Sequence, residues 1–227
     1  MNNAKDIVEV TGKVFIKDLV RILPLGGTAV EIYDELQSKQ IERKIRRLEE
    51  FYTNLAATMS VQQDKINKEF VSKDDFLDVF EEATRFVVIE RQEQKRMLFK
   101  NILVNSIVAS DCDYDRAERF FRLLDNLGEL ELRVLAVLEN PEQYNQTHGM
   151  IIQNQSSWIS VTSMGVLTQL LELKVHQVEE AISVLFSNGL VIENSMGKQL
   201  QTNGNTIYVL NNLLTTRGIS FVKYLKG

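Results

Sequence analysis

The residues of this chain that could do chemistry are few and lie far apart in the sequence. Asp111, Asp113 and Asp115 alternate as carboxylates do at the start of a calcium-binding loop, but the glycine and closing glutamate of such a loop do not follow at the required spacing. The alternative interpretation is that Asp113 caps the helix that follows it. We therefore predict no metal site and no bound cofactor.

The candidate nucleophiles and general bases are also isolated. The sequence has one cysteine, Cys112, and two histidines, His148 and His176, and none of them has a second such residue at the spacing of a catalytic or metal-binding pair. The sequence contains no phosphate-binding loop, no dinucleotide-binding glycine pattern and no nucleophile elbow. These features predict a protein that is not an enzyme and that has no evident small-molecule substrate.

The composition is that of an ordinary soluble chain. Its 227 residues are 44% hydrophobic and 25% charged, which suits one large domain or two small ones. The net charge of −5 makes binding through nucleic-acid phosphates less expected, because such binding needs a basic face. With a single cysteine, no signal peptide and no evident membrane span, the expected location is the cytoplasm.

Residues 161–191 are predicted to form two helices joined by a tight turn, and the remaining elements are organised around them. Thr162 or Ser163 can cap the first helix, and Asn188-Gly189 ends the second with a residue that tolerates positive φ. Apolar residues recur at helical spacing on one face of each helix. Those of the first helix are Met164, Leu167, Leu170 and Leu171, and those of the second are Val178, Ala181, Ile182 and Leu185.

The order of elements around these helices is that of a winged helix. Residues 190–192 begin a strand, and residues 206–210 form its expected partner across a polar turn, which gives a small β-hairpin. Helix, turn, helix and hairpin wing is the winged-helix order. We therefore predict a winged-helix-like domain over residues 128–227, in which 140–158 is a long surface connection with a short strand at 150–152.

The rest of the chain is expected to form an N-terminal helical domain over residues 1–127, so that the fold class is mainly α. The predicted helices of this domain span residues 4–23, 28–69, 73–109 and 113–127. The second of these is one long helix without an internal glycine or proline. The third either runs on or breaks near residues 90–93.

The helix at residues 4–23 is amphipathic. Lys13, Lys17 and Arg21 recur every four residues and form a basic stripe opposite the apolar face. One interpretation is a helix that lies on an anionic membrane surface. The other is an ordinary core-packing helix with a solvated charged face, which the nearby acids Asp6 and Asp18 favour.

The long helix carries a heptad-like seam, in which apolar residues alternate in steps of four and three. Such a seam packs along a partner helix, either another segment of this chain or a second copy of it. The charges that flank the seam at residues 42–50 form a solvated face or, alternatively, a nucleic-acid patch. The seam residues are Ile41, Ile45, Leu48, Tyr52, Leu55 and Met59.

The second helix of the winged-helix-like domain decides between a nucleic-acid partner and a protein partner. A DNA-reading helix needs exposed donors, and the candidates here are Lys174, His176 and Gln177, with Lys198 in the wing. Glu179 and Glu180 would repel phosphates. We therefore expect this module to bind protein, and DNA binding is the alternative.

Several local patterns resemble the Abi-alpha family, a bacterial group associated with abortive infection against phage. They are the Pro-Leu-Gly-Gly break at 24–27, RMLFKNILVNSIVASD at 96–111 with ERFFRLLDNLGELELRVLAVL at 118–138, and SVLFSNGLV at 183–191 with LLTTRGISFVKYL at 213–225. The resemblance implies a helical protein of phage defence and brings no catalytic residues. The expected function is interaction with a protein partner or self-association, with a DNA-binding regulator and a membrane-acting effector that uses helix 4–23 as alternatives.

Overall fold

The computed structural model describes residues 42–109, 114–149, 151–152, 159–192, 196–202 and 206–226. The fold is mainly helical with a small two-stranded antiparallel sheet, which confirms the predicted class. The chain divides into two compact units, Met1–Leu124 with Tyr224–Gly227, and Asp125–Lys223. The expected division into domains at residues 127 and 128 remains a prediction, because a compact unit is not thereby shown to fold alone.

Some predicted features lie outside the described residues. They are the helix at 4–23 with its stripe of Lys13, Lys17 and Arg21, the first seam residue Ile41, and the expected helix cap Asp113.

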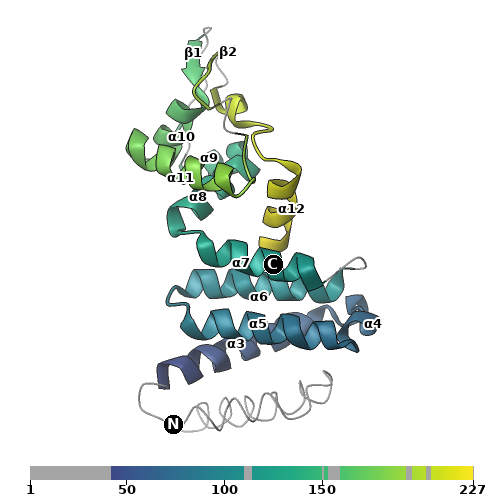
Figure 1. Cartoon of the computed structure of the whole chain (residues 1–227). Helices are drawn as coiled ribbons and strands as arrows, with labels where there is room; N and C mark the ends of the chain where they lie inside the picture. Colours follow the sequence, from purple (N-terminus) through teal and green to yellow (C-terminus); the bar gives the residue numbers. More distant parts are fainter. Residues whose placement is uncertain are drawn as a thin grey trace. The chain divides into compact units, whose positions relative to one another are not determined.

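The first unit is built on helices that pack side by side. α3 (Glu42–Val61) packs against α5 (Asp74–Ile89) and α6 (Glu93–Val108), and α5 packs against α6 (Figure 1). Phenylalanine rings join these helices to α7 (Tyr114–Asn126), because the rings of Phe86 and Phe99 stack with centroids 5.2 Å apart and that of Phe121 lies 6.2 Å from Phe99. Aromatic burial of this kind is a large part of the core stabilisation.

The long helix predicted for 28–69 ends earlier than expected. α3 ends at Val61, and a short 3₁₀ turn, η1 (Gln63–Lys65), and the single turn α4 (Lys68–Val71) follow. Asn67 provides the physical reason, since its side chain accepts a hydrogen bond from Phe70 N and donates one to Ala109 O. Asparagine competes with helical backbone bonding in this way, so a continuous helix is not formed.

The segment predicted as one helix at 73–109 is broken at residues 90–92. Glu90 and Gln92, at the end of α5 and the start of α6, both have extended backbone conformations. The Glu90 carboxylate accepts a hydrogen bond from the backbone N–H of Gln92 at 2.7 Å, which stabilises the corner. The break lets α6 pack back on α5. Of the two predicted alternatives, a continuous helix or a break near residues 90–93, the break is therefore correct.

The last turn of α12 (Thr216–Leu225) is anchored to α6 by neutral amide groups. Asn101 donates from Nδ2 to Leu225 O at 2.8 Å, and Asn105 donates to Tyr224 O at 3.0 Å and Lys226 O at 2.8 Å. These carbonyls are among those that the end of a helix leaves without intrahelical partners. The amides of α6 therefore act as a C-terminal cap for α12.

In the second unit, α8 (Glu129–Glu139) packs against both α10 (Ser163–Leu171) and α11 (Val175–Ser187). Part of the surface connection predicted at 140–158 is in fact a helix, α9 (Pro141–Thr147). Asn140 caps it by accepting a hydrogen bond from Gln143 N, and proline is favourable at the first helical position because it has no N–H to satisfy. Pro141 thus starts a helix besides following the end of α8.

The pair α10 and α11 was well predicted. Thr162 caps α10 by accepting from Gly165 N at 3.0 Å, and Gly189 follows α11 with a φ of +69°. Of the predicted apolar faces, all residues but the half-buried Met164 are buried. The buried ones are Leu167, Leu170, Leu171, Val178, Ala181, Ile182 and Leu185.

The predicted β-hairpin is wrong, because the two strands come from segments that are not consecutive. β1 (Ile159–Thr162) lies before α10 and pairs antiparallel with β2 (Gln199–Thr202), with Val161 opposite Leu200. The expected strand at 206–210 is instead a 3₁₀ helix, η3 (Thr206–Leu210). A half-exposed strand buries alternate residues, whereas η3 buries every residue except Tyr208, which explains the helical turn.

The segment after α11 is tied to the start of α12. Thr215 donates from its backbone N–H to Leu190 O at 2.9 Å and from its hydroxyl to Gly189 O, and the same hydroxyl oxygen accepts from Gly218 N. Val191 forms a single antiparallel bridge with Leu214, so the strand expected at 190–192 is reduced to that bridge. A Cβ atom on Gly218 would overlap the Leu190 carbonyl oxygen.

We expect the Gly218→Ala substitution to lower the free energy of unfolding by about 1–3 kcal/mol, because the added methyl group forces two backbone segments apart. Urea denaturation followed by circular dichroism measures this change. Gly197→Ala is the matched control, since a Cβ there meets no atom within 4 Å. Equal stability of the two variants would show that the backbone at Gly218 is not closely packed.

Candidate functional site

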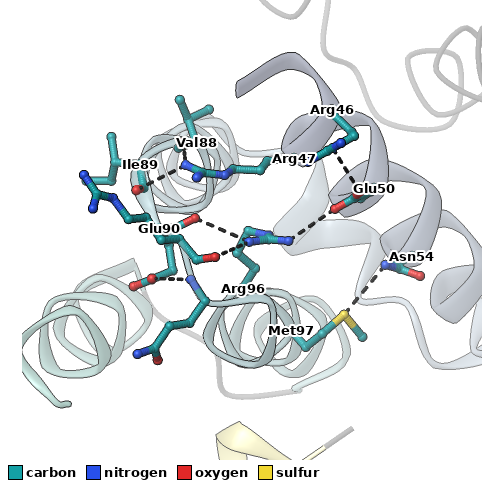
Figure 2. A network of polar contacts seen from close by, with 11 residues as sticks. Arg46, Arg47, Glu50, Asn54, Val88, Ile89, Glu90, Arg96 and Met97 are labelled. Carbon is teal, nitrogen blue, oxygen red and sulfur yellow. Dashed lines mark hydrogen bonds and ion pairs between the residues drawn. The ribbon is translucent and has the colours of Figure 1, made fainter. Parts of the chain in front are cut away.

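A network of charged side chains lies where α3, α5 and α6 meet (Figure 2). Arg47 of α3 donates to Val88 O at 2.9 Å and to Ile89 O at 3.3 Å. Arg96 of α6 donates to Arg91 O at 3.0 Å and forms an ion pair with Glu50 of α3 at 3.2 Å. Two arginines therefore converge on the carboxyl end of α5.

This arrangement stabilises the carboxyl end of α5. The carbonyls at the end of a helix lack intrahelical partners and carry partial negative charge, which arginine satisfies. Glu90 is engaged as well, since its carboxylate lies 3.5 Å from the Lys95 ammonium and also accepts from Gln92 N. The network is a cap for α5, shared by three helices.

Lys100 of α6 is a buried lysine near this network. Its ammonium donates to the Thr58 hydroxyl at 3.1 Å, and only 7% of the residue is exposed. Burial lowers the pKa of Lys100 from its ordinary value, because the charged form loses hydration. No carboxylate of the described residues forms an ion pair with it, so the charge is a cost to the fold.

Most of the predicted seam on α3 faces other helices of the same chain. Leu48 and Leu55 are buried, and the Tyr52 hydroxyl lies 3.4 Å from that of Thr84 on α5. Burial raises the pKa of Tyr52. Ile45 and Met59 are half-buried. The described part of the seam is thus largely occupied within the chain, and a second copy is not needed to cover Leu48, Tyr52 or Leu55.

Phe51 and Ala56 are also buried on α3, although the seam does not include them. A helix that packs against both α5 and α6 needs a wider apolar face than the narrow stripe of a two-helix seam. The sequence already indicates this wider face, because Phe51 lies three residues after Leu48 and Ala56 lies four residues after Tyr52.

The described residues hold no group of three or more His, Cys, Asp or Glu side chains suited to a metal ion. Asp115, the described member of the aspartate run, is exposed and pairs with Arg119 at 3.6 Å. His148 stacks on Tyr144 with ring centroids 3.9 Å apart. Among the described helices, none has both the length and the apolar character required to cross a membrane.

The exposed side of α11 carries polar, acidic and apolar residues. Glu179 and Glu180 are exposed, and no lysine or arginine occurs within Val175–Ser187. Three apolar side chains are exposed on the same helix, namely Val175 at 51%, Val184 at 36% and Phe186 at 44%. Val175 and Phe186 lie on one side of the helix, and Val184 lies on the other side, two residues before Phe186.

The residues that were predicted as DNA contacts do not form one basic surface. Lys174, His176 and Lys198 are exposed, and Lys174 and His176 lie next to the two glutamates in sequence. The Gln177 side chain accepts a hydrogen bond from Lys174 N at 3.1 Å, so its carbonyl is used to cap α11. Gln177 would have to give up this cap in order to read a base.

The sequence analysis missed the apolar part of this surface. Val175, Val184 and Phe186 lie off the buried face, which is visible from their helical spacing relative to Val178 and Leu185. The sequence pattern of α11 therefore already indicates these exposed apolar positions. We name these five residues, Val175, Glu179, Glu180, Val184 and Phe186, the α11 face.

Comparisons with protein-family models, with curated proteins and with solved structures found no match.

Arg47→Ala is expected to lower the free energy of unfolding by about 1–2 kcal/mol, because two carbonyls at the end of α5 lose a charged donor. Arg46→Ala is the matched control on the same helix. Arg46 is exposed and, within the part of the chain that the structure describes, forms an ion pair with Glu50 at 3.7 Å, so its loss should cost less than about 0.5 kcal/mol. Equal effects in chemical denaturation would contradict the capping role of Arg47.

Lys100→Met is expected to be at least as stable as the wild type at pH 7, since the lowered pKa means that the folded state disfavours the ammonium. This cost is present below the lowered pKa and disappears as the pH rises toward the ordinary value of 10.5. The advantage of the variant should therefore shrink between pH 7 and pH 10 in urea denaturation. Lys68→Met, at an exposed position of α4, is the control for the loss of a lysine.

Proposed function

We propose that this chain is a non-enzymatic interaction protein whose second unit is winged-helix-like and binds a polypeptide partner through the α11 face. The observation that carries the proposal is the composition of the exposed positions of that helix, with two glutamates, three apolar side chains and no lysine or arginine within Val175–Ser187. A surface with few bases and large apolar side chains matches protein contacts better than contacts with phosphates.

The order of elements supports the winged-helix-like description. β1 precedes α10 and α11, the bridge at Val191 follows them, and β2 returns to pair with β1. α8 packs against both α10 and α11, as the first helix of such a domain does. In this arrangement α11 takes the position of the helix that would enter the major groove of DNA.

The charges on α11 favour protein over DNA at that position. Glu179 and Glu180 would face phosphates across a groove, and no lysine or arginine within the helix offsets that repulsion. The nearest candidates, Lys174 and Lys198, are at the start of α11 and in the turn before β2. The DNA-binding regulator remains the alternative that the experiment below tests.

The biological context that we propose is defence against phage, and the resemblance to the Abi-alpha family is what supports it. The segments that carry this resemblance include the end of α11 and all of α12. The protein partner is then a component of the host or of the phage, or a second copy of the chain. The membrane-acting alternative depends on residues 4–23, which lie outside the described residues.

Phage challenge of a bacterial host that expresses the chain tests this function. We expect fewer plaques with the wild type for some members of a phage panel, and loss of that protection in Val184→Ser/Phe186→Ser. Both side chains are exposed, so the double variant should fold normally. The matched control, Leu200→Ser/Tyr208→Ser, removes two exposed apolar side chains elsewhere in the same unit and should keep the protection.

Fluorescence anisotropy with duplex DNA at low salt provides the second measurement. We expect no saturable binding by the wild type, whereas binding that weakens steeply with salt would favour the DNA-binding alternative. Absence of protection by the wild type against every phage of the panel would overturn the proposed context. Equal loss of protection in both double variants would overturn the role of the α11 face.

A further inference from the structure

We infer that the open edge of β2 pairs with the same edge of a second copy of the chain, so that two small sheets join into one of four strands. The residues that carry this inference are Gln199, Leu200 and Gln201. The inference goes beyond the proposed function, because it concerns another element than α11 and names a different occupant.

The backbone of β2 is paired along one edge. β1 pairs with it in continuous register, and no backbone hydrogen bond joins Gln199, Leu200 or Gln201 to any other segment that the structure describes. The backbone groups of successive strand residues point to opposite edges, so β1 can satisfy only alternate residues. Either Leu200 or both glutamines therefore present N–H and C=O groups along the other edge.

This part of β2 is accessible to a partner. The two strands lie at one end of the second unit, where α10 contacts β1 and η3 contacts both strands (Figure 1). Gln199, Leu200 and Gln201 are all exposed, and 38% of Leu200 is accessible to solvent. Successive strand residues point to opposite faces, so three exposed residues in a row mean that β2 is solvated on both faces here.

An open strand edge selects an extended backbone as its ligand, because another strand presents donors and acceptors at the matching spacing. Natural sheets often protect such edges with lysine, proline or a bulge. Gln199–Thr202 contains no lysine and no proline, and its continuous register with β1 leaves no bulge. Its four-residue length limits the strength of pairing but does not prevent it.

The side chains of β2 are complementary to themselves, which favours a second copy over a foreign strand. In an antiparallel pairing about a two-fold axis at Leu200, this leucine lies opposite its own copy, and Gln199 lies opposite Gln201 of the second copy. The two exposed leucines cover each other. Each glutamine amide is both a donor and an acceptor, so opposed glutamines can hydrogen-bond. Lys198 lies opposite Thr202 of the second copy, so no like charges meet.

Sedimentation velocity of the full chain tests this pairing. So short a pairing buries little surface, so we expect a weak dimer with a dissociation constant of about 10–100 µM. Gln199→Lys/Gln201→Lys places lysines opposite each other in both crossed pairs and should weaken the dimer about tenfold. The matched control, Gln146→Lys/Gln169→Lys, makes the same change at exposed glutamines of α9 and α10 and should alter the dissociation constant by less than about twofold.

A charge-swap experiment separates a broken interface from a damaged fold. Gln199→Glu/Gln201→Glu should also weaken the dimer of identical chains. An equimolar mixture of this variant with Gln199→Lys/Gln201→Lys should form a mixed dimer at least as tight as the wild-type one, because each lysine then lies opposite a glutamate. Recovery in the mixture requires both variants to be folded. In the wild type, hydrogen exchange at Gln199–Gln201 should slow as the protein concentration rises.

Three results would overturn the inference. They are a wild-type chain that stays monomeric throughout the expected range of concentration, a dimer that weakens equally in the test and control variants, and a mixture of the two charged variants that stays monomeric. Protection of the β2 amides only by an added extended peptide would identify a foreign strand as the occupant and would also contradict the pairing of two copies.

Failure of this inference is distinct from failure of the proposed function, because its readout is the association state and not phage protection. The pairing uses main-chain groups of β2. Leu200→Ser leaves those groups in place, so the control variant for the α11 face retains the edge.

Discussion

The close approach of Gly218 to the carbonyl of Leu190 constrains the whole second unit. A Cβ at this position would overlap the Leu190 carbonyl oxygen, and the same oxygen accepts a hydrogen bond from the backbone N–H of Thr215. Gly189 ends α11 with a positive φ, and the residue after it, Leu190, lies within hydrogen-bonding distance of Thr215 before α12. The buried face of α11 is thereby fixed against α8 and α10, and this fixed packing leaves the opposite face of α11 exposed.

The sequence predicts local structure correctly where that structure depends on interactions between neighbouring residues. The helical periodicity of α10 and α11, the cap at Thr162 and the turn at Gly189 all follow from interactions within a few residues, and each was predicted correctly. The same periodicity contains the exposed positions of Val184 and Phe186. The residues of the α11 face were therefore derivable, although the chemistry of their partner was not.

Sequence reasoning failed where distant segments decide the local conformation. Thr206–Leu210 has the composition of a strand, yet it packs against α9 and α10 as a 3₁₀ helix that is buried on nearly all sides. β1 pairs with β2 although α10 and α11 lie between them in the sequence, and no local sequence pattern predicts this pairing. The role of Arg47 as a cap for α5 likewise requires α3 and α5 to be in contact first.

The carboxyl ends of α5 and α12 are stabilised by different kinds of side chain, charged ones at α5 and neutral amides at α12. These contacts therefore respond differently to ionic strength. The carbonyls of α12 accept from the uncharged amides of Asn101 and Asn105, which dissolved ions scarcely screen. Around α5, the arginine–glutamate contact between Arg96 and Glu50 is partly exposed and loses attraction as counter-ions accumulate. In a concentrated salt solution, Tyr224 and Leu225 would keep their hydrogen bonds to α6 after the ion pair between α3 and α6 had weakened.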